Sequence, residues 1–468
     1  MTSAALSPVR VAIIGAGPAG FYAAEYLLRS ESPIVEVDLF DRLPTPFGLV
    51  RSGVAPDHQK IKSVTRVFEK VATHERFRFF GNVCFGEHLT LADFEDHYHQ
   101  ILFTTGAQSD RRLGIPGEDL AGSHSATEFV AWYNGHPDFG DLSFDLTHER
   151  AVVVGVGNVA IDVARILCRT QEELAQTDIA DYALEALKES RIREVVMLGR
   201  RGPAQAAFTY PEVKELGEMV DADVATLPEE VDLDPLSAAA LAANPDRTTE
   251  KIVARLQEYA QREPGGRSRR IVLRFLASPT EILGDGEGKV RAIRIVKNEL
   301  VEDERGDGLR PRATQYTEQI PAGVIFRSVG YRGVPLADIP FREDWAIIPN
   351  DAGRVLAADG KPSNGLYVAG WIKRGPSGVI GTNKPDAQET GRAMLEDAAL
   401  GRTLKPKRPT AADAERFITE RRPEALTYDD WRRIDAHEIA LGATSGRPRV
   451  KLCSLDDMFE ALGRKVQL

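Results

Sequence analysis

The amino-acid sequence predicts an α/β fold that contains two Rossmann-like domains. Two glycine-rich turns, at residues 15–20 and 155–160, each lie between an apolar, β-branched stretch and a stretch with helical periodicity. The length of 468 residues exceeds that of one ordinary domain. A strand–turn–helix unit that occurs twice in a chain of this length indicates two mainly parallel sheets, each with its own crossover helices.

The composition is that of a globular protein and excludes several classes of function. Hydrophobic residues make up 43% of the chain and charged residues 28%, and no apolar run approaches the roughly 20 residues of a membrane span. The formal net charge of −11 argues against nonspecific binding to nucleic acid. The first apolar strand begins at Val9, which leaves no room for a targeting peptide on the chain as given. We expect a cytoplasmic protein, and a monomer, with no membrane insertion and no nucleic-acid partner.

Three cysteines occur in the sequence, and they lie far apart at Cys84, Cys168 and Cys453. There is no CxxC pair, so the sequence offers neither a redox-active dithiol nor ligands for a metal cluster. We expect three free thiols in a reducing compartment, and no metal site.

The first turn reads Gly-Ala-Gly-Pro-Ala-Gly, which fits the pattern G-x-G-x-x-G of a dinucleotide-binding loop. Gly15 permits the tight turn, Gly17 lets the backbone approach a diphosphate, and Gly20 lets the helix pack close to the strand. The helix N-terminus favours the anionic diphosphate. The next apolar strand ends at Asp41, whose carboxylate is placed to accept hydrogen bonds from an adenosine ribose. The alternative is a glycine-rich turn without a ligand.

A proline-rich loop with few charges, residues 43–58, follows the first unit. A loop this rigid is costly unless it shapes a pocket, so we predict that it lines the first dinucleotide site. A surface connection stiffened by prolines is the alternative.

The second turn, Gly-Val-Gly-Asn-Val-Ala, has Ala160 where a third glycine can stand. Its returning strand, 194–198, ends in Gly-Arg-Arg-Gly instead of an acid. An acid would pair with a ribose 2′-hydroxyl, whereas the guanidinium groups of Arg200 and Arg201 suit a 2′-phosphate. The sequence therefore predicts NADP at the second loop and leaves the first loop for FAD. The alternative is an exposed pair of arginines in a turn. The long gap between Gly157 and Arg200 predicts an insertion in the crossover.

The middle of the chain is expected to be mainly helical, with one hairpin. Residues 171–191 and 226–262 are rich in Ala, Glu and Leu, which favours helices. The stretches 271–275 and 290–296 have the pattern of strands that form a hairpin around a glycine-rich turn. The polar stretch 302–319 predicts a loop or an edge hairpin.

Three further strand–turn segments, at 100–107, 324–331 and 365–371, are typical of places where two-dinucleotide flavoproteins cross between domains. Trp371 stands where many flavoproteins carry an aspartate on the ribityl chain, and it could cover the flavin ring. The segment 375–383 precedes a helix whose N-terminus would stabilise reduced, anionic flavin. An ordinary capped helix is the alternative.

These residues together give a specific resemblance over essentially the whole chain. The sequence resembles the adrenodoxin-reductase-like ferredoxin–NADP(+) reductases in LPTPFGLVRSGVAPDH, GVGNVAIDVAR, GRRGP, GWIKRGPSGVIGTNKPDA and the tail WRRIDAHEIALGATSGRPRVKL. The resemblance implies a discontinuous FAD domain formed by residues 1–108 and 331–468. It implies an NADP domain, residues 109–330, inserted between these two parts.

The resemblance also assigns residues to the sites. Together with the glycines of the first loop, it implies FAD contacts at Ala19, Asp41, Leu49, Phe85, Trp371, Gly378, Val379 and Ile380. It implies NADP contacts at Arg111, Val156, Gly157, Asn158, Val159, Arg200, Arg201, Glu212 and Gly378. A proton-handling or nicotinamide-positioning network is implied at His58, Asp162 and Glu215. For His58, a loop histidine bonded to the backbone is the alternative.

The implied activity is that of a flavoprotein oxidoreductase in electron transport: hydride passes from NADPH to FAD, and single electrons pass to a ferredoxin-type iron–sulfur protein. Three rival functions remain open at this point: a glutamate-synthase-like electron-input subunit, a flavin monooxygenase and a non-catalytic NADP sensor. For docking, the densest basic cluster is Arg262, Arg267, Arg269 and Arg270, for which a solvated loop is the favoured interpretation.

Overall fold

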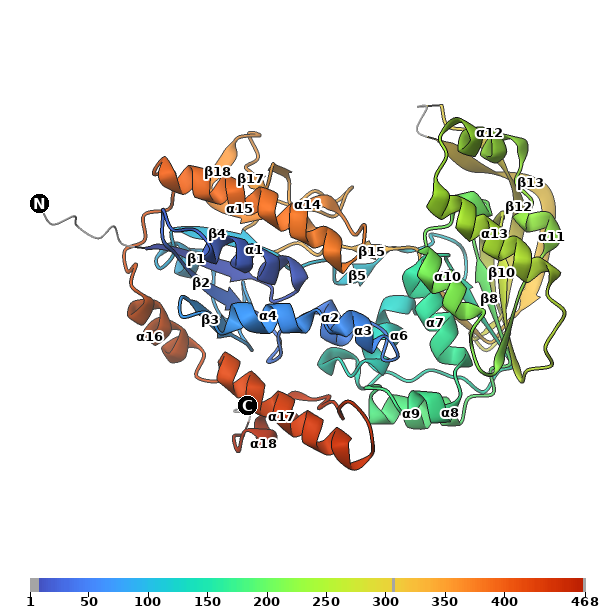
Figure 1. Ribbon diagram of the computed structural model, residues 1–468, viewed down its shortest axis with the longest axis horizontal. Helices are drawn as coiled ribbons and strands as arrows, with labels where there is room; N and C mark the ends of the chain where they lie inside the picture. Colours follow the sequence, from blue (N-terminus) through green and yellow to red (C-terminus); the bar gives the residue numbers. More distant parts are fainter. Residues whose placement is uncertain (1–7, 305–307, 466–468) are drawn as a thin grey trace, which may run out of the picture.

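The computed structural model describes residues 8–304 and 308–465, which form two α/β halves side by side (Figure 1). One half is built on a seven-stranded sheet and the other on a six-stranded sheet. Each half contains one of the two glycine-rich turns, because β1 precedes the first turn and β7 precedes the second. The α/β class and the two Rossmann-like units are thereby confirmed.

The seven-stranded sheet takes strands from both ends of the chain. Its order is β16, β17, β18, β4, β1, β2 and β3, with the bounds Asn350–Asp351, Arg354–Leu356, Pro362–Val368, Gln100–Phe103, Val9–Ile14, Val35–Phe40 and Phe77–Phe80. The five strands from β18 to β3 are parallel, and β17 and β16 extend the sheet as antiparallel edge strands. The first predicted unit is confirmed, because β1 begins at Val9 as expected and β2 ends at Phe40, directly before Asp41.

Helices from distant parts of the sequence cover this sheet. They are α1 Pro18–Leu28, α2 Leu49–Ser52, α3 Gln59–Lys62, α4 Thr65–Ala72, α5 Leu91–Glu95, α14 Trp371–Arg374, η3 Ile380–Thr382, α15 Asn383–Ala399, α16 Ala411–Arg421, α17 Tyr428–Thr444 and α18 Leu455–Ala461. Helix α1 packs along α15 (Figure 1). The C-terminal helices also belong to this half, because Trp431, Ile434 and Phe459 share one buried core with Phe21 and Leu39.

The six-stranded sheet is parallel throughout, in the order β6, β14, β7, β8, β10 and β9. These strands span Ser123–Ser125, Val324–Arg327, Arg150–Val154, Glu194–Leu198, Arg269–Arg274 and Ala222–Thr226. Its helices are α6 Ala126–Tyr133, η1 Pro137–Phe139, α7 Asn158–Cys168, α8 Gln171–Leu174, α9 Asp181–Lys188, η2 Pro203–Gln205, α10 Tyr210–Leu216, α11 Pro228–Val231, α12 Pro235–Ala243 and α13 Arg247–Gln261. The predicted insertion in the crossover therefore consists of α8 and α9.

The predicted hairpin is wrong in its first strand. The stretch expected there, β10, is an inner strand of the parallel sheet between β8 and β9. The antiparallel partner of β12 Val290–Glu302 is β11 Ala277–Gly284, and β13 Leu309–Pro321 adds the third strand. The stretch expected to be a loop or edge hairpin is thus mainly an edge strand, and residues 305–307 of it lie outside the described residues.

A two-stranded ribbon lies between the halves, formed by β5 Ser109–Asp110 and β15 Tyr331–Arg332 (Figure 1). The chain leaves the seven-stranded half at β5 and returns to it at β15. This ribbon supports the division into 1–108, 109–330 and 331–468, which stays a prediction.

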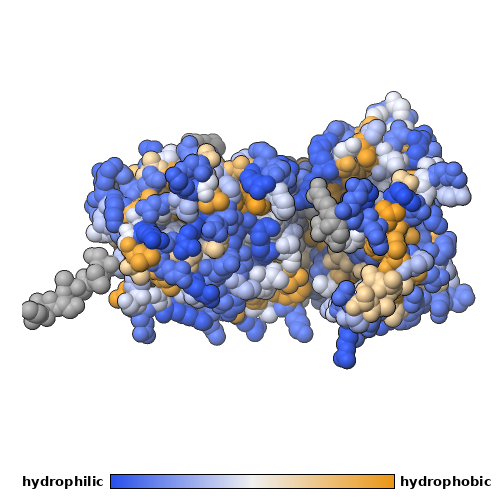
Figure 2. Space-filling model, turned by 90° about the horizontal axis from the view of Figure 1, so that it is seen from above, coloured by the Kyte–Doolittle hydropathy of each residue, from blue (hydrophilic) through white to orange (hydrophobic). Residues whose placement is uncertain are grey.

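The surface is mainly hydrophilic, and apolar side chains gather only in small separate patches on the face that Figure 2 shows. Over the described ranges, no helix combines the length and the apolar character needed to cross a membrane. Cys84, Cys168 and Cys453 are free. Burial raises the pKa of Cys168 to about 12 and that of Cys453 to about 11, so neither thiol is activated.

Candidate functional site

The three glycines of the first turn have different surroundings. Gly15 has φ +110°, and a Cβ there would lie 2.7 Å from the carbonyl oxygen of Thr104. A Cβ on Gly20 would lie 2.3 Å from the carbonyl oxygen of Gly15. By contrast, a Cβ on Gly17 would have no atom within 4 Å. Close packing therefore requires glycine at positions 15 and 20. Gly17 instead faces open space at the N-terminus of α1, where no side chain caps the helix.

Asp41 holds the first turn in place. Its Oδ2 accepts a hydrogen bond from the Ala16 N–H at 2.8 Å, and its Oδ1 accepts one from the Leu43 N–H at 3.0 Å. Burial raises the pKa of this carboxyl, although both backbone bonds oppose the shift. Each carboxylate oxygen keeps a second lone pair that could accept a ribose hydroxyl.

The other residues expected at FAD lie around this turn. Ala19 contacts the turn at Gly370, where a Cβ would lie 2.7 Å from the Ala19 Cβ. Phe85 is half-buried and packs edge-on against Phe103, and Leu49 begins α2. The 43–58 loop is held by apolar packing, since the ring of Phe47 meets that of Trp431 edge-on.

Trp371 begins α14, and its ring lies 5.3 Å from that of Tyr331. Its Nε1–H donates to the Ser377 carbonyl at 3.1 Å, which fixes the ring. Gly378 has φ +78°, and Val379 is half exposed, immediately before η3 and α15.

The second turn resembles the first, with one glycine in a crowded position and one in an open position. Gly155 has φ +137°, and a Cβ there would lie 2.1 Å from the Ser328 carbonyl oxygen. A Cβ on Gly157 would meet nothing within 4 Å, and no side chain caps α7. Asn158 joins α7 to α10, because its Oδ1 accepts the Thr209 N–H at 2.8 Å. The neighbours Val156 and Val159 are partly buried against the core of this half.

The two arginines after β8 form no ion pair with an acid in the part of the chain that the structure describes. Arg200 is exposed, and Arg201 makes one long hydrogen bond, from Nη2 to the Gln205 carbonyl at 3.4 Å. No carboxylate within residues 8–304 and 308–465 forms an ion pair with either guanidinium. Partial burial and the charge of Arg200 together lower the pKa of Arg201. Two adjacent, uncompensated cations at this edge favour an anion. Arg111, the remaining NADP candidate, lies in the ribbon region, where its N–H donates to the Gly330 carbonyl.

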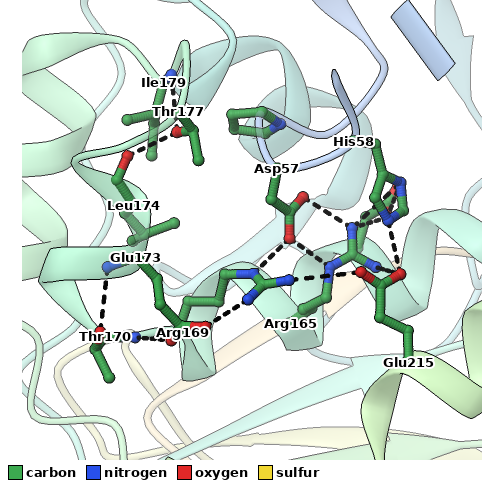
Figure 3. Close-up of polar contacts among 12 residues, drawn as sticks. Asp57, His58, Arg165, Arg169, Thr170, Glu173, Leu174, Thr177, Ile179 and Glu215 are labelled. Carbon is green, nitrogen blue, oxygen red and sulfur yellow. Dashed lines mark hydrogen bonds and ion pairs between the residues drawn. The ribbon is translucent and has the colours of Figure 1, made fainter. Parts of the chain in front are cut away.

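A cluster of charged side chains lies where the 43–58 loop meets α7 and α10 (Figure 3). His58 Nε2 lies 2.9 Å from Glu215 Oε2, and 3.9 Å from Glu212 Oε2. His58 Nδ1 lies 3.9 Å from Asp162 Oδ1. The structure thus brings together all three residues expected in the proton-handling network. It adds Glu212, which the resemblance assigns to NADP.

Arg165 is the centre of this cluster, and its side chain is fully buried. Its Nε and Nη2 donate to Asp57 at 2.6 and 3.0 Å, and Nη2 also donates to Asp162 Oδ1 at 2.7 Å. Its Nη1 donates to Glu212 Oε2 at 3.3 Å. Arg169, one helical turn later, donates to Asp57 at 2.5 Å (Figure 3). Two guanidinium groups therefore order four carboxylates around one imidazole.

The charges and the burial within the cluster shift the pKa values of its acids in opposite directions. Burial raises the pKa of Asp162 to about 6, with Arg165 opposing the shift. The pKa of Asp57 is lowered, because the two arginines outweigh its burial. Burial lowers the pKa of His58, but the bond to Glu215 and the other carboxylates outweigh it and leave that pKa raised. Titration near neutrality is a common property of sites that move protons.

Comparison with known proteins decides the family. The family model described as pyridine nucleotide-disulphide oxidoreductase matches residues 9–198. The chain is 47% identical over 456 residues to the NADPH-ferredoxin reductase FprA of Mycobacterium leprae, covering 96% of this chain and 97% of that protein. It is 39% identical to the mitochondrial NADPH:adrenodoxin oxidoreductase of Arabidopsis thaliana, covering 98% and 96%.

A solved structure of Mycobacterium tuberculosis FprA in complex with NADPH superposes with a TM-score of 0.90, at 46% identity, and covers 97% of this chain and all of that one. The chain belongs to the adrenodoxin-reductase-like family of ferredoxin–NADP(+) reductases. The family expected from the sequence motifs is thereby confirmed.

Three residues of this reductase's cluster were missed by sequence reasoning: Asp57, Arg165 and Arg169. Arg165 lies three residues after Asp162, so the two share one face of α7, and Arg169 follows four residues later as the C-cap of this helix. This spacing could have indicated that these side chains lie close together. The contact of both arginines with Asp57 joins residues more than 100 positions apart, so no local sequence pattern predicts it.

The basic cluster near residue 262 is mostly neutralised in this reductase. Arg262 pairs with Glu258, and Arg270 pairs with Glu194. Arg267 and Arg269 donate to backbone carbonyls of Met219 and Arg169. Charges engaged in this way are poorly suited to steer an acidic partner. The expected solvated loop is wrong in part, because Arg269 and Arg270 begin strand β10 and Arg262 is the C-cap of α13.

Replacing His58 by Gln is expected to slow the reduction of bound flavin by NADPH roughly ten- to a hundredfold, with flavin content unchanged. The glutamine side chain could still donate a hydrogen bond towards Glu215, but an amide cannot hold or pass a proton. Anaerobic stopped-flow reduction measures the rate, and His148→Gln, at an exposed and remote histidine, is the control. An unchanged rate in His58→Gln would refute the role.

Proposed function

We propose that this chain is an FAD-dependent ferredoxin–NADP(+) reductase that binds FAD at the first glycine turn and NADP(H) at the second. One observation carries the assignment. The two glycine turns leave the same open space for a diphosphate, but the strand that follows ends at an acid in the first unit and at two arginines in the second. Gly17 and Gly157 each leave room at an uncapped helix N-terminus, which fits a diphosphate. The first unit then ends at Asp41 and the second at unpaired arginines.

FAD, when bound, accepts a hydride from NADPH and returns the electrons singly to an iron–sulfur protein. The protein supplies binding and orientation. Ala19, Leu49, Phe85 and the turn at Gly378 would hold FAD, with Trp371 beside its rings. Val156, Val159 and Arg111 would line the NADP site. The relatives named for ferredoxin and adrenodoxin reduction support the iron–sulfur partner.

The cluster around His58 would hold and pass protons and orient the nicotinamide. With the hydrogen on Nε2, the ring donates to Glu215 while Nδ1 accepts from Arg165 Nη2 at 3.4 Å. That assignment satisfies both ring nitrogens. To take up a proton at Nδ1, the ring would have to exchange its contact with Arg165 for one with Asp162, whose Oδ1 lies 3.9 Å away. Release of the other proton from Nε2 to Glu215 would complete the relay. Asp162 is the acid best placed to exchange the proton at Nδ1, because its pKa of about 6 lies near neutrality.

Replacing Arg200 and Arg201 together by Ala is expected to weaken NADPH binding by about a hundredfold to ten-thousandfold and to leave NADH binding unchanged. Each guanidinium bond to a phosphate contributes about 1.5–3 kcal/mol, and only NADPH carries the 2′-phosphate. Anaerobic titration of both proteins with NADPH and NADH gives the affinities. If the unaltered protein binds both nucleotides equally, the assignment of these arginines is wrong.

The function itself is tested by a visible spectrum, followed by anaerobic NADPH addition and then by cytochrome c reduction through added ferredoxin. A yellow protein that NADPH bleaches, and whose cytochrome c reduction depends on ferredoxin, is the expected result. A colourless protein would indicate a nucleotide sensor, and oxygen-dependent hydroxylation would indicate a monooxygenase. We further propose a cytoplasmic location, which cell fractionation tests.

A further inference from the structure

A segment near the C-terminus spans the junction of the two halves. After α17 the chain continues without helix or strand through residues 446–453, which we call the C-terminal strap, and then enters α18. Helix α17 belongs to the core of the seven-stranded half. Figure 1 shows α17 running towards α9 of the other half, and the strap makes the contact there. The strap thus begins in one half and reaches the other.

Lys451 is bound by acceptors from both halves. Its Nζ donates to the Arg51 carbonyl of α2 at 3.0 Å, on the seven-stranded side. It also donates to the carbonyl and Oδ1 of Asn134, at the end of α6, at 3.0 and 3.2 Å. The side chain is 1% exposed and lies 3.5 Å from Asp178 Oδ2. Burial lowers the pKa of Lys451 to about 7, and a buried amine is costly unless its N–H groups are bonded, so these acceptors fix the strap against both halves.

Two further basic residues, Arg447 and Lys62, reinforce this junction through contacts with the six-stranded side. Arg447 donates to the carbonyls of Thr177, at 2.9 Å, and Ile179, and it pairs with Asp181 of α9. Asp178 is also bound by Lys62 of α3, whose Nζ lies 2.6 Å from Oδ1. The segment before α9 is therefore held from the strap and from α3 at once.

On the seven-stranded side the strap is fixed through Glu438, which is fully buried in α17. Both Glu438 oxygens accept hydrogen bonds from Arg51, at 2.9 and 2.5 Å. Glu438 also accepts the Leu452 N–H at 2.9 Å and Arg449 Nη1 at 3.1 Å. Arg51 lies in the 43–58 loop, between Leu49 and His58. The strap therefore holds the same loop that presents the proposed FAD contact and the imidazole of the cluster.

We propose that the C-terminal strap is a latch between the halves, in which Lys451 and Arg447 set the position of the NADP-binding half relative to the flavin loop for hydride transfer. This rests on the proposed function. Hydride transfer requires reacting atoms about 3–3.5 Å apart, and a misplacement of about 1 Å costs roughly a hundredfold. Lys451 contacts both halves, and Arg447 ties the strap to the NADP-binding half. Both are positioning residues, because neither contacts a residue assigned to the nucleotides.

The test uses the full-length holoprotein in three variants: Lys451→Met, Arg447→Met and the control Arg464→Met. Arg464, which follows α18, pairs with Asp430 of α17, and both residues belong to the seven-stranded half. For each variant we would measure flavin content, the NADPH affinity, the rate of flavin reduction by NADPH and the rate at which dithionite-reduced protein passes electrons to ferricyanide. The long-wavelength charge-transfer absorbance of NADPH-treated protein reports ring stacking independently of the rate.

The latch predicts that flavin reduction slows roughly 10- to 100-fold in Lys451→Met and Arg447→Met, and that charge-transfer absorbance falls. Flavin content and electron output to ferricyanide should stay unchanged, and Arg464→Met should behave as the unaltered protein. If Lys451→Met does not retain flavin, the proposal is tested with Arg447→Met alone, because the Arg447 side chain is less deeply buried. An unchanged reduction rate in a flavin-loaded latch variant would overturn the proposal, and so would equal slowing in the control. An unaltered protein that NADPH does not bleach would instead refute the proposed function.

Discussion

Replacing Gly17 by Val is expected to give a folded protein that purifies without flavin. A Cβ at Gly17 meets no protein atom within 4 Å, and its φ of −83° suits any residue. The chain therefore tolerates the side chain, which instead occupies the space assigned to the diphosphate. The visible spectrum of the purified protein measures flavin, and circular dichroism measures the fold.

Gly157→Val is the matched variant for the second turn. It has the same open surroundings and an ordinary φ of −108°, so it should keep its flavin and lose NADPH binding instead. Each variant is the control for the other. Retained flavin in Gly17→Val, or unchanged NADPH affinity in Gly157→Val, would show that the diphosphate of that cofactor lies elsewhere.

Replacing Arg165 by Met is expected to lower the free energy of unfolding by about 3–5 kcal/mol at pH 7. Arg165 is fully buried and bonded to Asp57, Asp162 and Glu212. Removing one partner of a buried ion pair leaves uncompensated charge, which is far more damaging than losing a surface pair. Urea denaturation measures the loss, with Arg342→Met, at an exposed pair with Asp344, as a control that should show no change.

The loss should shrink as the pH falls. Arg165 lowers the pKa of Asp57 in the folded protein, so this pair contributes stability above the unfolded pKa of about 4 and loses it as pH falls through the folded pKa. In Arg165→Met the buried carboxyls take up protons more readily, so lowering the pH removes part of the loss in the free energy of unfolding. Asp162 acts in the same direction. Its pKa is already raised to about 6 with Arg165 opposing the shift, so removing Arg165 raises it further, and the variant gains more stability than the unaltered protein as this carboxyl is protonated. A loss that is equal at pH 7 and pH 5 would contradict this account.

The local features of the fold were predictable from the sequence because they depend on local geometry. A tight turn with positive φ requires glycine, so Gly15 and Gly155 mark the two Rossmann units without any knowledge of the rest. The chemistry after each unit, an acid in one and two arginines in the other, is equally local. The insertion of one domain into the other came from the family resemblance, since no local pattern shows that β18 pairs with β4.

Features that depend on distant pairing could not be predicted in the same way. The apolar run that forms β10 fits a hairpin strand or an inner parallel strand equally well, and only its position between β8 and β9 distinguishes them. The same limit applies to the cluster. Asp162 and Glu215 were expected through the resemblance, but the burial of Arg165 among acids from three segments depends on the tertiary fold. The strap contacts of Lys451 are of this kind too.

The pairing of β18 with β4 has a consequence for how the protein is made. The six-stranded sheet is complete once the ribosome has released β14, because all its strands lie between β6 and that point. The seven-stranded sheet must wait for β18, and its core for Trp431 and Phe459. Since domains fold as units during synthesis, the six-stranded half should fold first. Strands β1 to β4 are synthesised earlier but cannot complete their sheet until β18 is available. Flavin would then be captured only after translation ends, so a chain truncated near its C-terminus loses its cofactor along with its tail.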